Sequence, residues 1–232
     1  MLLATLLQFA GLAAWPVSAS YLAAASNDSE LIRKYLNAMQ IQDVARQGSV
    51  QEVTIEARLP KLNRQATLRT LRRISPSGEI TYQTLDAQGD GVVRREVIAR
   101  YLSAESQERE TERIAITPSH YRFRFARTVE QAGRRIHIFE LAPKKKQVGL
   151  FKGELWVDGQ TGLPVHESGR FVKSPSIFIK RIVFARDYED HDGLNLPARI
   201  RSTVESRIAG RAELDIRFSI PSQPDADGCG PR

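Results

Sequence analysis

Short stretches of alternating polar and apolar residues fill the second half of the sequence and constrain its fold more than any other feature. From residue 120 onward, segments containing Gly or Pro separate these stretches, which have the two-residue period of half-buried strands. Strands are predicted at residues 120–128, 134–141, 148–158, 163–172, 177–188, 196–207 and 211–220. Because the intervening turns are short, neighbouring strands are expected to pair in antiparallel fashion.

The first half of the sequence adds three strands and two helices to this pattern. Strands are predicted at residues 50–59, 66–74 and 79–85. One helix is expected to begin at Asp28 or Ser29, whose side chains can cap it, and to end near Gln42. Its apolar residues fall on one stripe at helical spacing: Leu31, Ile32, Tyr35, Leu36 and Met39. Residues 92–112 are predicted as a second helix, because their apolar residues do not alternate and a charged stretch follows them.

A sheet of about ten twisted strands has to close, split into a sandwich or wrap around another element. Only two helices are predicted, so these have to cover its apolar face. The length of 232 residues suits a single core. The sequence therefore predicts one α+β domain, mainly β, in which a curved and partly open antiparallel barrel carries the helices on its concave face.

The amino-terminal segment has the features of an export signal. Residues 1–27 hold no charged side chain, and the apolar part at residues 2–14 is shorter than the span of about 20 residues that crosses a membrane. Residues 17–19 (Val-Ser-Ala) resemble a signal-peptidase site. We therefore predict a signal peptide at residues 1–19, cleavage at about Ala19, and an exported, soluble periplasmic protein. An uncleaved anchor and a buried amino-terminal helix are the alternatives.

The remaining chain is basic and contains one cysteine. Residues 20–220 form the predicted single domain, and residues 221–232, rich in Pro, Asp and Gly, are predicted to be disordered. The net charge of +7 favours anionic partners such as a membrane surface or an acidic protein face. Because the basic residues are spread along the strands, no nucleic-acid partner is predicted. Cys229 has no second cysteine with which to form a disulfide or a metal cluster.

No residue pattern in the sequence indicates catalysis, a metal or a cofactor. The four histidines are scattered, and neither a His-Glu-x-x-His nor a Gly-x-Ser-x-Gly motif is present. The acidic segment at residues 187–193 is placed in a turn, and it lacks the spacing of a calcium-binding EF-hand loop. Glu154 and Asp158 are interpreted as solubility groups on a wet strand face rather than as an acid–base pair. We therefore predict no catalytic residues, no metal ligands, no cofactor and no enzymatic activity.

One predicted strand offers a candidate ligand-binding face. Within residues 148–158, Phe151, Gly153, Leu155 and Val157 share one parity, and they are predicted to line a pocket beneath the helices. Gly153 either leaves room for an approaching ligand or helix side chain, or marks a bend of the strand. In both interpretations these four residues face the concave side of the sheet.

Two short motifs lie in and beside this strand. The first comprises residues 152–158, the turn at Thr161-Gly162 and residues 163–165, and the second comprises residues 184–188, Asp192-Gly193 and Leu196-Pro197. They resemble the central strands of the LolA-like superfamily, the bacterial outer-membrane lipoprotein-sorting-like proteins. The resemblance covers roughly residues 28–220 in element order. It implies an unclosed antiparallel β-barrel of about 10–11 strands with two or so helices covering the concave face, and an apolar hollow that shelters acyl chains.

These features together predict a non-enzymatic bacterial cell-envelope protein that binds a lipid, a lipoprotein acyl chain or another amphiphile in a concave pocket. Each buried methylene contributes about 0.8 kcal/mol, so directed polar contacts are not required. One alternative is a protein-interaction or sensor module of the same fold whose hollow is filled by its own helices. Another is an enzyme whose site the sequence does not reveal. Occupancy of the hollow by a lipid separates the first two.

Overall fold

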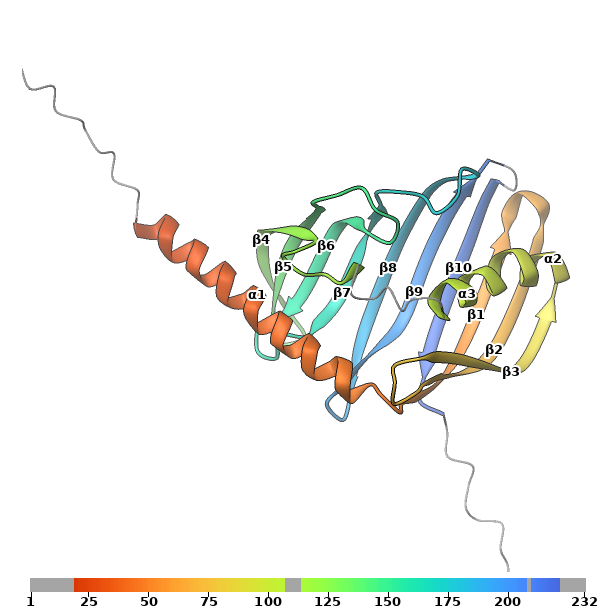
Figure 1. Ribbon diagram of the computed structural model, residues 1–232, viewed down its shortest axis with the longest axis horizontal. Helices are drawn as coiled ribbons and strands as arrows, with labels where there is room; N and C mark the ends of the chain where they lie inside the picture. Colours follow the sequence, from red (N-terminus) through yellow and green to blue (C-terminus); the bar gives the residue numbers. More distant parts are fainter. Residues whose placement is uncertain (1–18, 107–113, 208–209, 222–232) are drawn as a thin grey trace, which may run out of the picture.

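The main element of the structure is a ten-stranded antiparallel sheet that is curved and does not close. The computed structural model describes residues 19–106, 114–207 and 210–221. The strand order is β3-β2-β1-β10-β9-β8-β7-β6-β5-β4, so β3 and β4 are the edges (Figure 1). The strands are β1 Val50–Leu59, β2 Arg64–Ile74, β3 Ile80–Gly89, β4 Tyr121–Gln131, β5 Arg134–Pro143, β6 Phe151–Asp158, β7 Pro164–Phe171, β8 Ile179–His191, β9 Leu194–Ser206 and β10 Gly210–Ser219. The predicted fold class is confirmed. Apart from Ala19 and Pro221, the predicted signal peptide and disordered tail lie outside the described residues.

Strand β1 illustrates how the alternating pattern becomes a two-faced sheet. Val53, Ile55 and Ala57 are at most 1% exposed, whereas Glu56 and Arg58 point to the opposite face. β1 pairs with β2 on one side and with β10 on the other. The apolar side chains of adjacent strands therefore form continuous rows across the concave face.

Several strand boundaries differ from the sequence prediction, and β3 extends to Gly89 rather than ending at residue 85. Two differences have a clear local cause. The acidic segment placed in a turn mostly continues β8, and only Asp192 and Gly193 separate β8 from β9. Their φ angles of 54° and 84° are those of a tight two-residue hairpin turn, which an Asp-Gly pair favours. β6 begins at Phe151 rather than at residue 148, because Gly149 has a φ of 89° and interrupts the extended chain.

Helix α1 spans Ala19–Ala45, so it begins well before the predicted start. Asp28 and Ser29 therefore lie within the helix rather than capping it. The alanine-rich sequence that precedes them has high helix propensity, which explains the extension. The predicted apolar stripe is confirmed, since all five of its members pack against the sheet. Among the described residues, no helix combines the length and apolarity needed to cross a membrane.

Polar contacts fix α1 along one end of the sheet. Gln42 donates from Nε2 to the carbonyl oxygen of Gly193 at 2.8 Å and accepts from the backbone N–H of Asn195 at 2.9 Å. Lys34 donates from Nζ to the carbonyl oxygen of Gly159 at 2.8 Å. α1 thus crosses the end where the β6–β7 and β8–β9 turns lie (Figure 1).

The second predicted helix is confirmed over its described part. It is continuous from Gly91 to Ser106 and consists of α2 (Gly91–Val93), the π-helical turn η2 (Arg94–Ile98) and α3 (Ala99–Ser106). Asp90 caps it, because its carboxylate accepts hydrogen bonds from the backbone N–H groups of Val92 and Val93 at 2.8 and 3.0 Å. The cap also lowers the pKa of Asp90, chiefly through the bond from Val93.

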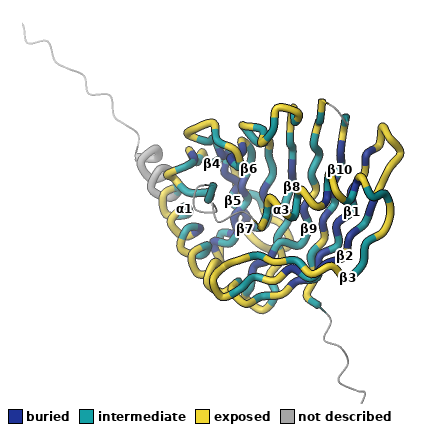
Figure 2. The backbone as a smooth tube through the Cα atoms, turned by 45° about the vertical axis from the view of Figure 1, so that its right-hand side comes forward, coloured by how far each residue is buried: buried dark blue, intermediate teal, exposed yellow. Residues whose placement is uncertain are grey.

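Each helical segment covers its own apolar cluster on the concave face. The cluster under the second helix comprises Val53, Ile55, Ala57, Leu59, Ala66, Leu68, Val93, Ile98, Ile200, Ala212, Leu214 and Ile216. The cluster under α1 comprises Tyr35, Tyr121, Phe139, Leu141, Leu150, Phe151, Leu155, Val157 and Phe184. Figure 2 shows buried stretches along the strands of both halves. The core is thus divided in two, with the central strands β8 and β9 between the halves.

Candidate functional site

A polar group lies on the concave face between the two apolar clusters. Arg186 on β8 and Glu167 on β7 are register partners. Arg186 Nη1 donates to Glu167 Oε2 at 3.5 Å and to the Tyr188 hydroxyl at 3.3 Å. The Tyr188 hydroxyl in turn donates to Glu167 Oε1 at 2.8 Å. The Arg186–Glu167 ion pair and the Tyr188 hydroxyl therefore form one polar group. On β8 the next inward-facing side chain before Arg186 is the buried Phe184.

Arg186 is recessed on this face and still exposed. Its side chain is 38% exposed, whereas that of its partner Glu167 is 5% exposed. Tyr188 and Glu167 raise the pKa of the Arg186 guanidinium, so the group stays charged. Its Nε is buried and has no hydrogen-bond partner among the described residues. The guanidinium is thus paired with Glu167, while its side chain as a whole is partly exposed.

Both helices bring a tyrosine toward this polar group. Burial is the main cause that raises the pKa of Tyr35 on α1, and the nearby Glu167 and Tyr188 raise it further. Burial likewise raises the pKa of Tyr101 on α3, which the positive charge of Arg186 counteracts. The phenols therefore stay neutral. Tyr35 thus lies near Glu167 and Tyr188, and Tyr101 lies near Arg186.

Aromatic side chains continue the concave surface beside Arg186. The ring of Phe184 lies 4.9 Å from that of Phe151 and 5.2 Å from that of Phe171, measured between centroids. Phe171 is only partly buried. A cation near the partly exposed ring of Phe171 suits an amphiphile, because an acyl chain packs on the ring while an anionic end group binds the guanidinium.

The predicted pocket residues lie deeper than this surface. Phe151, Leu155 and Val157 face the concave side, as their parity indicated, and they are 5%, 0% and 1% exposed. They belong to the cluster on which α1 packs. Their role in binding a ligand stays a prediction, and it requires α1 or its side chains to move.

Gly153 makes a close backbone contact between strands. A Cβ atom added there would lie 1.9 Å from the carbonyl oxygen of Ser168 and 2.5 Å from the Cα of Gly169, its register partner. Of the two interpretations offered by the sequence, this geometry supports the bend. The absent side chain lets β6 and β7 curl together, and its space is taken by the protein itself.

The carboxylate of Glu105 anchors α3 to the two strands beneath it. Glu105 accepts from Arg72 Nε on β2 at 2.9 Å and also from the hydroxyl of Tyr82 on β3. The side chains of Arg72 and Glu105 are 10% and 17% exposed. Burial and the neighbouring carboxylate raise the pKa of Tyr82. These contacts hold one wall of the concave face in place.

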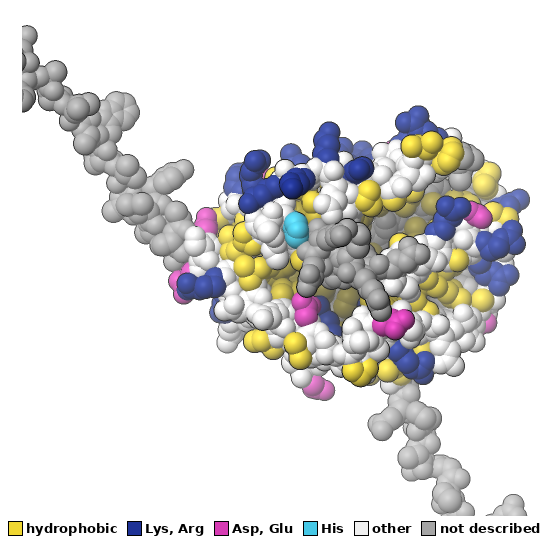
Figure 3. Space-filling view, viewed as in Figure 1, with side chains coloured by type: hydrophobic (Ala, Val, Ile, Leu, Met, Phe, Trp, Pro, Cys, Tyr) yellow, Lys and Arg dark blue, Asp and Glu magenta, His cyan; other side chains and the backbone are white. Residues whose placement is uncertain are grey.

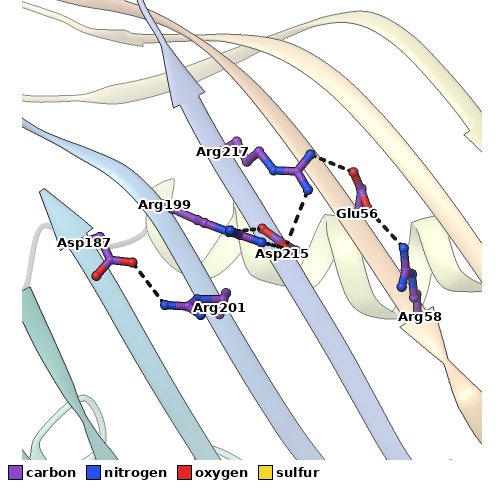
Figure 4. A network of polar contacts seen from close by, with 7 residues as sticks. All are labelled: Glu56, Arg58, Asp187, Arg199, Arg201, Asp215 and Arg217. Atoms are coloured by element: carbon purple, nitrogen blue, oxygen red, sulfur yellow. Dashed lines mark hydrogen bonds and ion pairs between the residues drawn. The ribbon is translucent and has the colours of Figure 1, made fainter. Parts of the chain in front are cut away.

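The opposite, outer face of the sheet carries a network of charges across β1, β8, β9 and β10 (Figure 4). Its members are Glu56, Arg58, Asp187, Arg199, Arg201, Asp215 and Arg217. Arg217 bridges two strands, with Nη1 2.9 Å from Glu56 and Nη2 3.7 Å from Asp215. The network borders an outer groove of about 670 Å³. Because the acidic groups pair with the arginines, we assign the network to holding the central strands together.

The described residues contain one histidine–aspartate contact that the sequence did not indicate. His166 Nδ1 lies 2.6 Å from Asp187 Oδ1, and the other carboxylate oxygen of Asp187 accepts from Arg201 at 3.3 Å. The ring of Trp156 meets that of His166 edge-on at 5.3 Å. No group of three or more potential metal ligands occurs among the described residues.

Sequence reasoning missed the Arg186 group, although a signal was present. Phe184, Arg186 and Tyr188 alternate along a predicted strand, so their side chains share one face. Arg186 therefore stands on the same face as two aromatic residues. Glu167 occupies the corresponding parity of the preceding strand. An inward charge on each of two adjacent strands indicates a buried pair, but only their register shows that the two meet.

The chain is similar in fold to several solved structures. They include a LolA superfamily protein from Nitrosomonas europaea, 13% identical, with a TM-score of 0.37 over 85% of this chain and 94% of that one. A DUF1329 family protein from Desulfovibrio piger is 14% identical, with a TM-score of 0.41 over 81% and 90% of the two chains. A putative outer membrane lipoprotein-sorting protein domain from Vibrio parahaemolyticus is 14% identical, with a TM-score of 0.34 over 81% and 93%.

Two of these structures bear the names of LolA-like or lipoprotein-sorting proteins, the group that the two sequence motifs resemble. No protein-family model matches the chain, and no curated protein matches it significantly. At such identities and TM-scores the likeness concerns the path of the chain. What this protein binds has to be inferred from its own residues.

Proposed function

We propose that the protein is a non-enzymatic cell-envelope protein that binds an amphiphile, either a lipid or a lipoprotein acyl chain, on its concave face. The single observation that carries this proposal is the recessed Arg186, 38% exposed between two apolar clusters. A charged group in such a place is costly unless it is paired, and the pairing by Glu167 leaves the side chain of Arg186 partly exposed. The acyl chain would lie over Phe171 and Phe184, with its anionic end at Arg186.

The proposal includes export to the periplasm after cleavage at about Ala19. In this proposal Phe151, Gly153, Leu155 and Val157 form the deeper floor, which a longer acyl chain reaches when α1 shifts. Apolar burial supplies the affinity at about 0.8 kcal/mol per methylene, and the charged contact orients the ligand.

The first test is recovery of a bound ligand. Protein purified from the envelope fraction should release acyl species on solvent extraction, detected by mass spectrometry. Binding is then measured with one defined probe, a fatty acid carrying a dansyl group at its distal end. We expect the probe to bind, and extracted lipid or unlabelled fatty acid to displace it.

A matched pair of variants isolates the cation. Glu167→Gln keeps Arg186, whereas the double variant Arg186→Met with Glu167→Gln lacks it, and neither leaves the glutamate buried without a partner. We expect the double variant to bind the fatty-acid probe about tenfold more weakly than Glu167→Gln, because a charge-assisted hydrogen bond is lost. Binding of the uncharged methyl ester should be equal in both. Equal binding of the charged probe would contradict a role for Arg186.

A second candidate function is a protein-interaction or sensor module with no lipid cargo. It is favoured by the burial of Phe151, Leu155 and Val157 beneath α1, since the protein's own helix fills that part of the hollow. Recovery of lipid-free protein that does not bind the probe would support this candidate over the first.

A further inference from the structure

At one end of the sheet, the turns that join one strand to the next carry only basic charges. Asp90, which links β3 to α2 at the same end, pairs with Arg64 at 3.7 Å. The turns at this end comprise residues 60–63, 144–150 and 172–178, together with Arg207 at the end of β9. They contain no Asp or Glu, and their six cations are all exposed: Lys61, Lys144, Lys145, Lys146, Lys173 and Arg207. We call this set of turns the basic edge. None of the six forms an ion pair with a residue that the structure describes.

The turns at the opposite end have the reverse composition. The turns between strands there, residues 75–79, 132–133, 159–163 and 192–193, contain no Lys or Arg, and they include the acidic Glu79 and Asp192. Arg46, in the link from α1 to β1 at this end, donates to the carbonyl oxygen of Asn195. α1 also lies along that opposite end. The charges of the turns are therefore segregated by end, and the basic edge is the end that α1 leaves uncovered.

Large apolar side chains stand among the cations of the basic edge. Ile177 is 80% exposed, Phe178 and Leu62 are each 51% exposed, and Val148 is 42% exposed. Figure 3 shows Lys and Arg side chains along this upper edge, with hydrophobic side chains among them. Exposed apolar groups surrounded by cations are typical of surfaces that insert into the headgroup region of anionic lipids.

Backbone contacts make these turns one continuous surface. The N–H of Val172 donates to the carbonyl oxygen of Leu150 at 2.9 Å, and the N–H of Arg207 donates to that of Phe178 at 2.8 Å. Gly210, where β10 begins, lies against the side chain of Lys61. These contacts link the described residues of the turns to one another and to the sheet, which lowers the entropy cost of docking.

We propose that the basic edge docks the protein on an anionic phospholipid surface, with Ile177 and Phe178 entering the headgroup layer. Charge complementarity selects this partner, because the edge offers six cations and no carboxylates in its turns. The proposal is independent of ligand binding on the concave face. Each cation near an anionic surface contributes about fivefold to the affinity, and salt weakens this contribution.

The test is vesicle flotation with protein recovered from the soluble fraction after expression of the full chain. Vesicles of equal parts phosphatidylcholine and phosphatidylglycerol should carry the protein, whereas pure phosphatidylcholine vesicles should not. Replacing Lys144, Lys145 and Lys146 by Gln should weaken binding on the order of a hundredfold. The charge-matched control replaces the exposed Arg33, Arg95 and Arg135 by Gln and should bind like the wild type.

A second pair of variants tests the apolar contribution. Ile177→Ser with Phe178→Ser should weaken binding at least tenfold. The control is Ile41→Ser with Val44→Ser, two residues of α1 that are 67% and 66% exposed, and it should bind normally. All these side chains are exposed, so circular dichroism should show unchanged folding. The proposal is overturned if the wild type does not bind anionic vesicles, including the case in which it binds an acidic protein instead. It is also overturned if a basic-edge variant and its control variant bind the vesicles equally well.

Discussion

At the scale of single residues, two glycines of neighbouring strands are important because they have no side chain. Gly153 and Gly169 face each other in register across β6 and β7, and neither strand could approach the other as closely with a Cβ atom between them. The curl of the sheet in the α1 half therefore rests on a pair of glycines. Gly169 also lies against the ring of Phe151, since an added Cβ would be 2.7 Å from a carbon of that ring.

Replacement of Gly153 tests this interpretation. Gly153→Ala should lower the free energy of unfolding by about 1–3 kcal/mol, because the added methyl group meets backbone atoms that cannot move independently. The measurement is urea denaturation followed by the fluorescence of Trp156.

The control for this prediction is Gly91→Ala. Gly91 opens α2, and the nearest atom to an added Cβ is 3.9 Å away. Alanine favours the helix there, so stability should stay equal or rise by up to about 1 kcal/mol. If Gly153→Ala is as stable as the wild type, β6 and β7 can separate to make room for the methyl group. The curl of the sheet would then not depend on the two glycines.

At the scale of elements, the two helices are attached to the sheet by different means. α1 lies on an apolar cluster and is fixed by bonds to turn carbonyls at one end of the sheet. α3 also packs on an apolar cluster, through Tyr101 and Leu102, and its polar attachment is one carboxylate, Glu105, which meets Arg72 and Tyr82 on neighbouring strands. The loss of that carboxylate should therefore affect α3 far more than a surface charge of the same helix would.

Replacement of Glu105 by alanine leaves Arg72, whose side chain is only 10% exposed, without its ion-pair partner. Glu105→Ala should lower the free energy of unfolding by about 3 kcal/mol, measured by chemical denaturation. The surface pair Glu96–Arg100, with side chains 52% and 75% exposed, provides the control, and Glu96→Ala should cost less than about 1 kcal/mol.

A compensating variant separates charge burial from packing. Arg72→Met combined with Glu105→Leu should recover most of the stability lost in Glu105→Ala, because no charge is then left buried. Should the double variant be as unstable as the single one, the hydrogen bonds rather than the charge would be the main attachment of α3.

At the scale of the whole molecule, β1 and β10 bring the two ends of the chain together. These strands lie side by side in the sheet, with Ile55 opposite Ile216. The outer charge network crosses this junction and reaches β8 and β9 (Figure 4). Asp215 lies at its centre, and the hydrogen bond from Arg199 is the main cause that lowers the pKa of its carboxyl.

This depressed pKa predicts how stability depends on pH. Since the folded pKa of Asp215 lies below its ordinary value of 3.8, the stabilisation is complete above that pH. It is lost as the pH falls through the lower folded value. Asp215→Asn should therefore be about 1 kcal/mol less stable than the wild type at neutral pH. The two should converge at the lowest pH, as measured by urea denaturation across a pH series.

The control for the pH series is Glu130→Gln, which breaks an ion pair whose side chains are 65% and 69% exposed. Its effect at neutral pH should be distinctly smaller than that of Asp215→Asn. If Asp215→Asn instead differs from the wild type by the same amount at every pH, ionisation of Asp215 does not hold the strands together.

The sequence by itself determined the strands and their faces. Alternation and turn residues belong to chain neighbours, so residues 50–59 predict both the strand and its buried row, and the same holds for the stripe on α1. The residues at which helices and strands begin and end were harder to predict from the sequence. The start of α1 at Ala19 and the two-residue turn at Asp192-Gly193 depend on propensity and pairing beyond the apolar pattern.

Only the tertiary structure decided which faces meet. The pairing of β1 with β10 and the contact of Arg186 with Glu167 depend on how strands pair across the sheet, and periodicity carries no information on such partners. The basic edge has the same origin, because its cations come from separate turns that antiparallel pairing returns to one end. Local sequence specifies which side of a strand is buried, whereas complementary packing over the whole chain specifies what it is buried against.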